Sequence, residues 1–539
     1  MNMKYINKVL LSTLLVALLV VGCDTDELHN LNINPQAVTQ INLNFLFTAA
    51  QLGAASGGSA GDNRYIDWRT NIGMCSYAIQ HLAQTGGGIA PGDKYTHNPE
   101  TSNAPFEFFY GDELKNLGEV LRQTGPGGYD EGNKVNTRNA ARIVRAFLFH
   151  RATDYYGSMP YADAIKAAGG GAEFFFPHYD TQKSIYLDLL KELDEASAAL
   201  SSGNPDDGFA AADLYYDGDI AKWKKFGYSL MLRLAMRISN VDAATANTYV
   251  AKAIAGGVFE SNNDNVWVPM AIGPSEWTNQ NGISRAFYPG DGGQPTFLSK
   301  TLIDFLKGSD PGTVADDDPR LMIISGGIGL WTPTDWTPTN VDPLAQKGMP
   351  NGKDQTTLEI FEGGPVVQDA TYSKINVKML QDDEPYMLMN YGEVELLLAE
   401  AAERGIGGAS GAKAHYDAGV KASMQMYTPY DASLTVSDGA VATYLATYPY
   451  DVTKPALEMI GEQMWVNKFF NWWDAWSDWR RTGFPVLVPT NYPGNVTGGT
   501  IPQRLRYHPL EISGNPNFSA GSTKPDEYTT KVWWAGGAE

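Results

Sequence analysis

Apolar residues recur every three or four positions along most of the chain, which is the period of an amphipathic helix. In residues 136–156, for example, Ile143 and Phe147 follow this spacing, and Asn136 or Thr137 is placed to cap the helix. The period-two alternation typical of half-buried strands is scarce. The sequence therefore predicts a mainly α protein, with further helices over 181–200, 219–239, 296–306, 388–404, 409–427, 439–447 and 454–479.

Many of these predicted helices come in pairs joined by short polar turns. A helical hairpin alone leaves one apolar face uncovered, so such pairs favour stacking of one hairpin on the next. No strict sequence repeat accompanies them. The pattern indicates tetratricopeptide-like hairpins of degenerate sequence.

Two regions depart from helical periodicity. Residues 256–381 and 485–539 are rich in Gly, Pro, Asn and Asp, which favour turns and loops. We interpret both as elaborations on the helical scaffold, since loops held by a rigid frame commonly carry binding residues. In the first region, tryptophans lie close to prolines in segments without helical pattern: Trp267, Trp277, Trp331 and Trp336.

The first residues of the chain have the pattern of a lipoprotein signal peptide. Two lysines precede a short apolar run that stops at Gly22, immediately before Cys23. The run is shorter than the roughly 20 residues a membrane-spanning helix needs. We expect cleavage before Cys23, whose acyl chains anchor the protein, because two or more chains hold a protein stably on a membrane.

These observations predict the domain organisation. Residues 1–22 form the signal peptide, residues 23–34 the lipidated cysteine and a polar leash, and residues 35–539 a single domain. With 539 residues, 43% of them hydrophobic, the chain can bury a large core. Cys75 alone remains once Cys23 carries lipid, so no disulfide forms within the chain, and Cys75 is expected to be a small buried hydrophobe.

The charge of the chain restricts its partners. The formal net charge is −21, and removal of residues 1–22 takes away two lysines and no acids, leaving −23. Nucleic-acid binding needs clustered Lys and Arg, so no nucleic-acid partner is expected. The seven histidines lack metal-ligand spacing. The acidic turns 217–219 and 316–318 lack the alternating spacing of a calcium loop, so we expect no cofactor and find no support for a structural Ca²⁺.

The densest aromatic cluster spans residues 471–481. Trp472, Trp476 and Trp479 lie on one helical face, the geometry of a buried stripe, so core packing is favoured over a sugar-binding platform. Asp474 and Asp478 are one turn apart, which raises the hypothesis of a glycosidase pair. The adjoining Arg480 and Arg481 are expected to neutralise these two carboxylates instead.

Several stretches together resemble the SusD/RagB family of nutrient-binding outer-membrane lipoproteins from Bacteroidetes, in its SusD-like branch. Segment 154–161 is similar to the family's D-x-Y/F-G-x-x-P-Y turn, and 463–481 with 483–485 to its Q-K-W … W-x-D-x-R-R-T-G-x-P signature. Gly227 and Tyr228 depart from the family, whose members often have Ala-Asn there, and residues 256–381, where ligand specificity would lie, match the family least. The other similar segments are 31–35, 44–50, 219–237, 318–321 and 391–404.

This resemblance implies a tetratricopeptide-like α fold on the outer face of the outer membrane. It implies a partner as well, a SusC-like TonB-dependent β-barrel that imports the captured oligosaccharide or peptide. Asp24, Asp26 and Glu27 look like the signal that sends such lipoproteins to the surface. The leading hypothesis is a non-catalytic oligosaccharide-binding protein. An oligopeptide receptor and a surface glycoside hydrolase are the alternatives.

The candidate ligand-binding residues are loop aromatics and their polar neighbours. Aromatic rings stack on the C–H faces of sugars while amides pair with sugar hydroxyls. The same rings could instead pin the loops to the scaffold or face the barrel partner. The candidates are Tyr95, Trp277, Asn279, Gln280, Asn281, Tyr288, Trp331 and Trp336.

Overall fold

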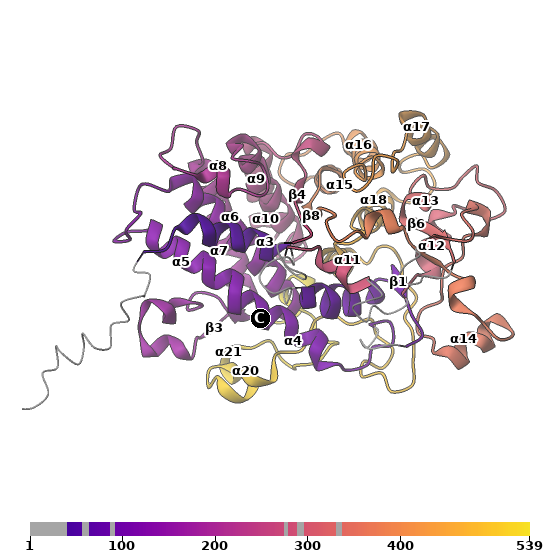
Figure 1. Cartoon of the computed structure of the whole chain (residues 1–539), viewed down its shortest axis with the longest axis horizontal. Helices are drawn as coiled ribbons and strands as arrows, with labels where there is room; N and C mark the ends of the chain where they lie inside the picture. The colour runs from indigo at the N-terminus through magenta and orange to yellow at the C-terminus, as the bar shows by residue number, and fades with distance from the viewer. Residues whose placement is uncertain (1–39, 56–63, 87–91, 274–278, 288–295, 330–336) are drawn as a thin grey trace, which may run out of the picture. The chain divides into compact units, whose positions relative to one another are not determined.

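The computed structural model describes residues 40–55, 64–86, 92–273, 279–287, 296–329 and 337–539. Residues Leu43–Glu539 form one compact unit. About 53% of the chain is helical, which confirms the mainly α class. Figure 1 shows the helices of this unit, with short strands between them.

The helices of the first half of the chain build one part of the core. Successive long helices pack on each other, α6 on α7 and α9 on α10, as helical hairpins do. Two π-helical segments, η2 (Ile66–Ser76) and η3 (Phe109–Glu113), and three 3₁₀ turns, η4 (Lys166–Gly169), η5 (Ala172–Phe175) and η6 (Asn262–Asp264), accompany them. The α-helices are α3 (Leu43–Ala54), α4 (Pro99–Phe108), α5 (Leu114–Thr124), α6 (Val135–Tyr156), α7 (Gln182–Ala199), α8 (Phe209–Ala212), α9 (Ile220–Arg237) and α10 (Ala243–Gly256).

The second half contributes a further set, in which α15 packs on α16 and on α18. Short 3₁₀ turns lie at 343–345, 368–370, 377–379 and 533–535. The α-helices are α11 (Gly282–Phe287), α12 (Lys300–Leu306), α13 (Leu321–Ile324), α14 (Gln355–Glu362), α15 (Tyr391–Glu403), α16 (Ala412–Met424), α17 (Asp438–Thr447), α18 (Ala456–Asn467), α19 (Trp472–Thr482), α20 (Pro509–Gly514) and α21 (Phe518–Gly521).

The strands of the described residues form four antiparallel pairs of two to four residues per strand. They tie together segments that lie far apart in the sequence. The pairs are β1 (Leu82–Ala83) with β5 (Phe297–Leu298), β2 (Met159–Pro160) with β3 (Tyr179–Asp180), β4 (Val266–Val268) with β8 (Tyr386–Met389), and β6 (Ser325–Ile328) with β7 (Ser373–Ile375).

Helix ends follow local chemistry where a cap is present in the sequence. Asp219 caps α9 as an N-cap residue should, because its carboxylate accepts hydrogen bonds from the backbone N–H groups of Ala221 (2.9 Å) and Lys222 (3.2 Å). The expected cap of α6 is wrong. Its N-cap position is Lys134, and the carboxylate of Asp206, from another segment, accepts the N–H of Thr137 at 2.5 Å.

The predicted continuous helix over 454–479 is also corrected. It is broken into α18 and α19, with Phe470 in the left-handed region at φ 78°. Asn71 holds this break. Its amide donates to the Phe470 carbonyl at 2.8 Å, and its side-chain oxygen accepts the N–H of Trp473 at 2.9 Å, which satisfies the first turn of α19.

Two other predicted helices begin later than expected because strands take their first residues. The segment 296–306 starts as β5, and Ser299 then caps α12 by accepting the N–H of Leu302. The segment 388–404 starts at the end of β8, and Asn390 caps α15 by accepting the N–H of Glu393 at 2.8 Å.

The core contains the aromatic stripe predicted at 472–479. Trp472 and Trp476 are fully buried, and the indole N–H of Trp476 donates to the Pro502 carbonyl at 2.9 Å. Trp479 is half-buried against the same core. Cys75 is buried as expected, and burial raises the pKa of its thiol to about 12, so it remains a neutral thiol.

Candidate functional site

A hollow of about 490 Å³ lies where three loops meet. The first loop follows β4, the second follows β6, and the third joins β7 to β8. Its volume falls in the range of small-molecule sites. We call it the loop hollow, and its lining residues are Ile272, Thr337, Pro338, Val377, Leu380, Gln381, Asp382 and Asp383.

The first loop is fixed to the third by Asn281. The backbone N–H of Asn281 donates to the Asp382 carbonyl at 2.8 Å, and its side-chain amide donates to the Glu384 carbonyl at 3.0 Å. Its side-chain oxygen accepts the N–H groups of Ile283 (2.9 Å) and Ser284 (3.2 Å) at the start of α11. One buried amide therefore holds two walls of the hollow in place.

The other two walls are held by the β6–β7 pair. Residue Ile328 at the end of β6 exchanges backbone hydrogen bonds with Asn340, which fixes the chain just after Thr337 and Pro338. After β7, the backbone N–H of Asn376 donates to Ile324. The side chain of Gln381 donates to the Val377 carbonyl at 2.8 Å and closes the third loop on itself.

The polar groups of the loop hollow are mostly hydrogen-bond acceptors. Asp383 is exposed and makes no hydrogen bond or ion pair with another described residue. Asp382 lies 3.6 Å from the guanidinium of buried Arg285. Glu384 is 8% exposed. Its burial, and to a smaller extent the negative charges of Asp383 and Asp431, raise its pKa to about 7. Aliphatic side chains, among them the exposed Ile272, complete the lining.

This arrangement suits a neutral polyhydroxylated ligand. Carboxylate and amide oxygens accept hydrogen bonds from hydroxyl groups, while the aliphatic side chains pack on C–H surfaces. An anionic ligand would meet the like charges of Asp382 and Asp383. The segment 381–383 was not among the candidates from sequence, although the polar run 381–384 between Leu380 and Pro385 was a usable signal.

Half of the predicted ligand-binding aromatics and amides can be placed. Asn279 has a left-handed backbone at φ 63°, and its carbonyl accepts the N–H of Ala271 at 2.8 Å, shaping the first loop. Gln280 and Asn281 are 6% and 4% exposed. Trp277, Tyr288, Trp331 and Trp336 lie outside the described residues, as does Cys23.

Tyr95 does not line the loop hollow. Its ring is 2% exposed, and its hydroxyl accepts the N–H of Thr490 at 3.2 Å. Its carbonyl accepts the N–H of Val496 at 2.9 Å, so the residue is tied to the C-terminal loops. Its role in ligand binding stays a prediction, as does that of every other candidate.

The carboxylates of Asp474 and Asp478 belong to a buried ionic cluster. Three cations surround them. Arg237 donates hydrogen bonds to both carboxylates, at 2.7 Å to Asp478, and Lys468 also donates to both, at 2.5 Å to Asp474. The guanidinium of Arg233 lies 3.4 Å from Asp474. These are cations of α9 and of the α18–α19 junction. The expectation that Arg480 and Arg481 neutralise the pair is therefore corrected; Arg481 only approaches Asp478 at 3.7 Å.

The cluster does not have the chemistry of a glycosidase pair. Burial alone would raise the pKa of Asp474, but Arg233, Lys468 and Arg237 together hold it well below its usual range. A glycosidase needs one carboxylic acid that keeps its proton near neutral pH. Asp474 and Asp478 are both ionised, so the pair stabilises a charged core and is unsuited to proton donation.

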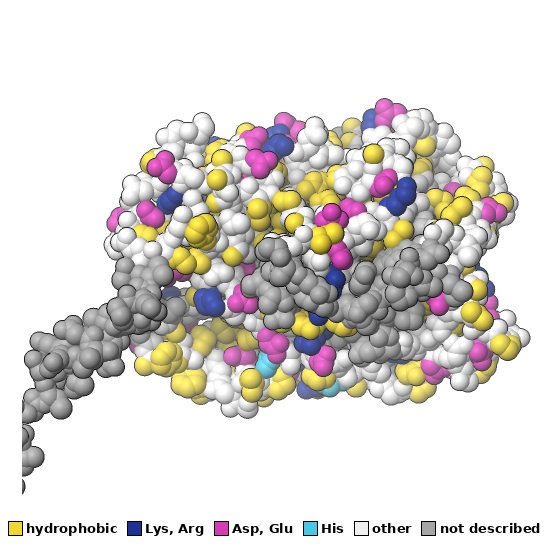
Figure 2. Space-filling view, viewed as in Figure 1, with side chains coloured by type: hydrophobic (Ala, Val, Ile, Leu, Met, Phe, Trp, Pro, Cys, Tyr) yellow, Lys and Arg dark blue, Asp and Glu magenta, His cyan; other side chains and the backbone are white. Residues whose placement is uncertain are grey.

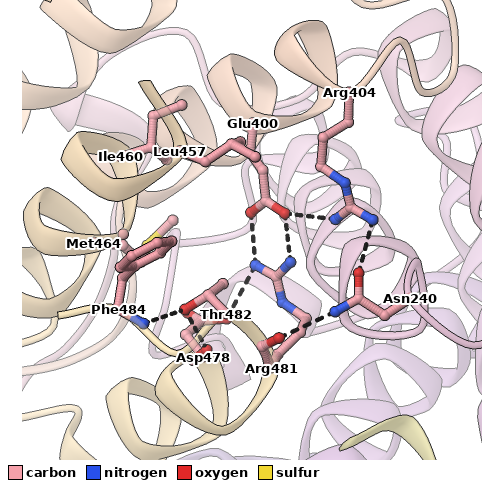
Figure 3. Close-up of a pocket in the computed structure, with 11 residues that line it drawn as sticks. Asn240, Glu400, Arg404, Leu457, Ile460, Met464, Asp478, Arg481, Thr482 and Phe484 are labelled. Atoms are coloured by element: carbon pink, nitrogen blue, oxygen red, sulfur yellow. Dashed lines mark hydrogen bonds and ion pairs between the residues drawn. The ribbon is translucent and has the colours of Figure 1, made fainter. Parts of the chain in front are cut away.

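A small cavity of about 160 Å³ opens beside this cluster (Figure 3). Glu400 binds Arg481 through both oxygens, at 2.5 and 2.7 Å, and accepts a further bond from Arg404 at 2.7 Å. Asn240 bridges the two arginines, accepting from Arg404 and donating to the Arg481 carbonyl. These charges are paired, the Thr482 hydroxyl donates to the Asp478 carbonyl, and most of the remaining wall is apolar, so the cavity offers little to a polyhydroxylated ligand.

Two features of the described residues bear on cofactors and membranes. No group of three or more His, Cys, Asp or Glu side chains could hold a metal ion there. No helix in those ranges has the length and apolarity to cross a bilayer. On the face in Figure 2, described Lys and Arg side chains are scattered among acidic and apolar ones.

Comparison with known proteins identifies the family. A family model described as "Starch-binding associating with outer membrane" matches residues 35–508. The chain belongs to the SusD-like family. This confirms the resemblance seen in the sequence motifs. No curated protein sequence matches the chain.

Solved SusD-like structures cover almost the whole chain. A chitin-binding protein is 30% identical over 92% of this chain and 100% of its own, with a TM-score of 0.74. A SusD-like protein of Bacteroidetes is 23% identical over 92% and 100% of the two chains, with a TM-score of 0.76. A chitin-binding SusD homologue from Flavobacterium johnsoniae is 22% identical over 92% and 99%, with a TM-score of 0.69.

Proposed function

We propose that the protein is a non-catalytic receptor that captures oligosaccharides of N-acetylglucosamine, of the chitin type, in the loop hollow. The observation that carries this proposal is the likeness, at 30% identity over 92% of the chain, to a protein named as chitin-binding. The exposed carboxylate of Asp383 and the amide of Gln381 would accept and donate hydrogen bonds to sugar groups. Asn281 would position the loops without touching the ligand.

The same proposal includes a place and a partner. The family description, which refers to association with the outer membrane, supports a lipid anchor at Cys23 on the cell exterior. From there the protein would deliver its ligand to a SusC-like TonB-dependent barrel. Mass spectrometry of the mature protein checks the anchor: an acylated Cys23 supports it, and an unmodified N-terminus at another residue contradicts it.

Isothermal titration calorimetry with chitotriose tests the ligand class. Maltotriose and a tripeptide mixture are titrated separately as the alternative ligands. We expect chitotriose to bind and the double variant Gln381→Ala/Asp383→Ala to weaken binding by roughly tenfold or more, because two polar partners are lost. The control is Asp112→Ala, a partly exposed acid that forms a surface ion pair with Lys115 at 3.8 Å.

The other outcomes of this titration are informative. Binding of the tripeptides and not of chitotriose would establish the oligopeptide receptor and overturn the glycan proposal. Chitotriose binding that the double variant leaves unchanged would remove the site from the loop hollow. The candidates Trp331→Ala and Trp336→Ala are measured alongside, and each is expected to weaken binding through loss of a stacking ring. Release of shorter sugars during the titration would contradict the non-catalytic assignment.

A further inference from the structure

A second hollow, of about 310 Å³, lies between four helices and shares no lining residue with the loop hollow. Its walls come from α12, α16, α17 and α18 and from the chain around residues 308–316 and 448–454. Three tyrosines dominate it: Tyr416, Tyr444 and Tyr448. We call it the tyrosine hollow. Its size is at the lower end of the range of small-molecule sites.

The aromatic walls of the tyrosine hollow are held rigidly. The rings of Tyr444 and Tyr448 pack with centroids 5.0 Å apart. The amide of Gln463 donates to the Tyr444 hydroxyl at 2.8 Å, while its oxygen accepts from buried Arg320 at 2.7 Å. The Tyr448 hydroxyl donates to the Asp316 carbonyl at 3.0 Å. A site preorganised in this way loses little conformational entropy when a ligand binds.

Two phenol groups of the hollow have protons to offer. Tyr416 is 1% exposed and lines the hollow, yet its hydroxyl makes no hydrogen bond within the described part of the chain. Tyr444 accepts a hydrogen bond from Gln463, and its own O–H has no acceptor in that part. Burial raises the pKa of both phenols, so both keep their protons and act as donors.

The charges of the hollow favour a neutral ligand. Lys454 is hydrogen-bonded to Glu462 and lies 3.7 Å from Glu458, so its charge is already balanced. Asp316 stays ionised because the hydroxyl of Ser309 and neighbouring N–H groups lower its pKa. A carboxylate or phosphate ligand would therefore meet like charge, and the free phenol donors need an uncharged acceptor such as a carbonyl oxygen.

Apolar side chains complete the recognition. Phe305 and Met459 line the same hollow and can pack on a methyl group. An acetamido group presents a carbonyl acceptor and a methyl group together, and the tyrosine rings can stack on the C–H face of the sugar that carries it. We propose that the tyrosine hollow is a second binding site, for a neutral sugar unit bearing an acetamido group. This inference does not depend on ligand binding in the loop hollow.

The test uses methyl β-N-acetylglucosaminide, with methyl β-glucoside as the sugar that lacks the acetamido group. Saturation-transfer NMR and titration calorimetry on the whole protein are expected to detect binding of the first and at least fivefold weaker binding of the second. Tyr416→Phe removes only the unpartnered hydroxyl and is expected to weaken binding about fivefold. Thr453→Trp, at an exposed lining residue whose hydroxyl donates to the Met459 sulfur at 3.8 Å, is expected to abolish it.

The matched control is Tyr427→Phe. Tyr427 is also 1% exposed and its hydroxyl has no hydrogen-bond partner among the described residues, but it does not line the hollow. If Tyr416→Phe and Tyr427→Phe have equal effects, or if the wild type does not bind the acetamido sugar, the inference is overturned. The inference is also overturned if the acetamido sugar still binds to Thr453→Trp but no longer binds to Gln381→Ala/Asp383→Ala. That result would leave the function proposed for the loop hollow intact.

Discussion

The buried ionic cluster and the loop hollow use the same kinds of side chain for opposite purposes. In the cluster, Asp474 and Glu393 are 1% exposed, and the guanidinium of Arg233 binds both oxygens of Glu393 at 2.6 and 2.7 Å. In the loop hollow, Asp383 is exposed and forms no ion pair with a described residue. The positions of the cations therefore decide which carboxylates stabilise the fold and which stay open to a ligand.

The difference follows from where the residues lie in the sequence. The cluster joins α9, α15 and α19, so its charges come from long helices whose packing brings them together. The carboxylates of the loop hollow are neighbours on one loop, where like charges cannot compensate each other. A buried charge without its partner is costly, whereas an exposed one is solvated by water.

The largest expected effect comes from Asp474→Asn, which removes one charge from the cluster and leaves Arg233, Arg237 and Lys468 undercompensated. The free energy of unfolding should fall by about 3–5 kcal/mol. Chemical denaturation followed by circular dichroism measures it. Asp383→Asn is the matched control, with an expected change below about 0.5 kcal/mol. Equal losses in the two variants would break the contrast between the regions.

A smaller effect is expected for Asn281→Ala, which tests whether the loop hollow depends on its positioning amide. The variant loses the bond to Glu384 and the cap on Ile283 and Ser284, at a cost of about 1–2 kcal/mol in unfolding free energy. Chitotriose affinity should fall with it, because two walls of the hollow are released.

The control for this variant is Asn98→Ala. Asn98 caps α4 by accepting the N–H of Glu100 at 2.9 Å, and it does not line the loop hollow. The Asn98→Ala substitution should lower the free energy of unfolding by a similar amount and leave the chitotriose affinity unchanged. A loss of affinity in both variants would show that global stability, and not loop position, governs binding.

Helices with strong periodicity were predictable from the sequence, because the pattern is local. Residues 136–156 were expected as a helix and form α6. The break between α18 and α19 was not predictable. It depends on Asn71, which lies about four hundred positions away and binds both sides of the break. The two-residue strands could not be predicted from the sequence for the same reason, since each is defined by its pairing with a distant segment.

For the candidate site, sequence reasoning named the region that contains the loop hollow but did not name the residues that line it. It placed the ligand loops within 256–381, and Asn281 does hold the walls of the loop hollow. It missed Asp382 and Asp383, which follow directly, because their location depends on the pairing of β8 with β4. It assigned the charges next to Asp474 to neighbours in sequence, whereas Arg237 and Lys468 provide them through helix packing.

A pH-dependent effect is expected for Glu384. This residue is 8% exposed, like the residues of the cluster, yet it belongs to the loop that lines the hollow. Burial and the charges of Asp383 and Asp431 raise its pKa from 4.5 to about 7 in the folded protein. Between these values the folded state holds a proton that the unfolded state has lost. The contribution of Glu384 to stability is therefore full below about pH 4.5 and is lost as the pH rises through 7.

The variant Glu384→Gln carries no titrating group at this position. Urea unfolding at pH 5 and pH 8 should show the wild type losing stability relative to this variant, and parallel pH profiles would mean that Glu384 titrates as an exposed acid.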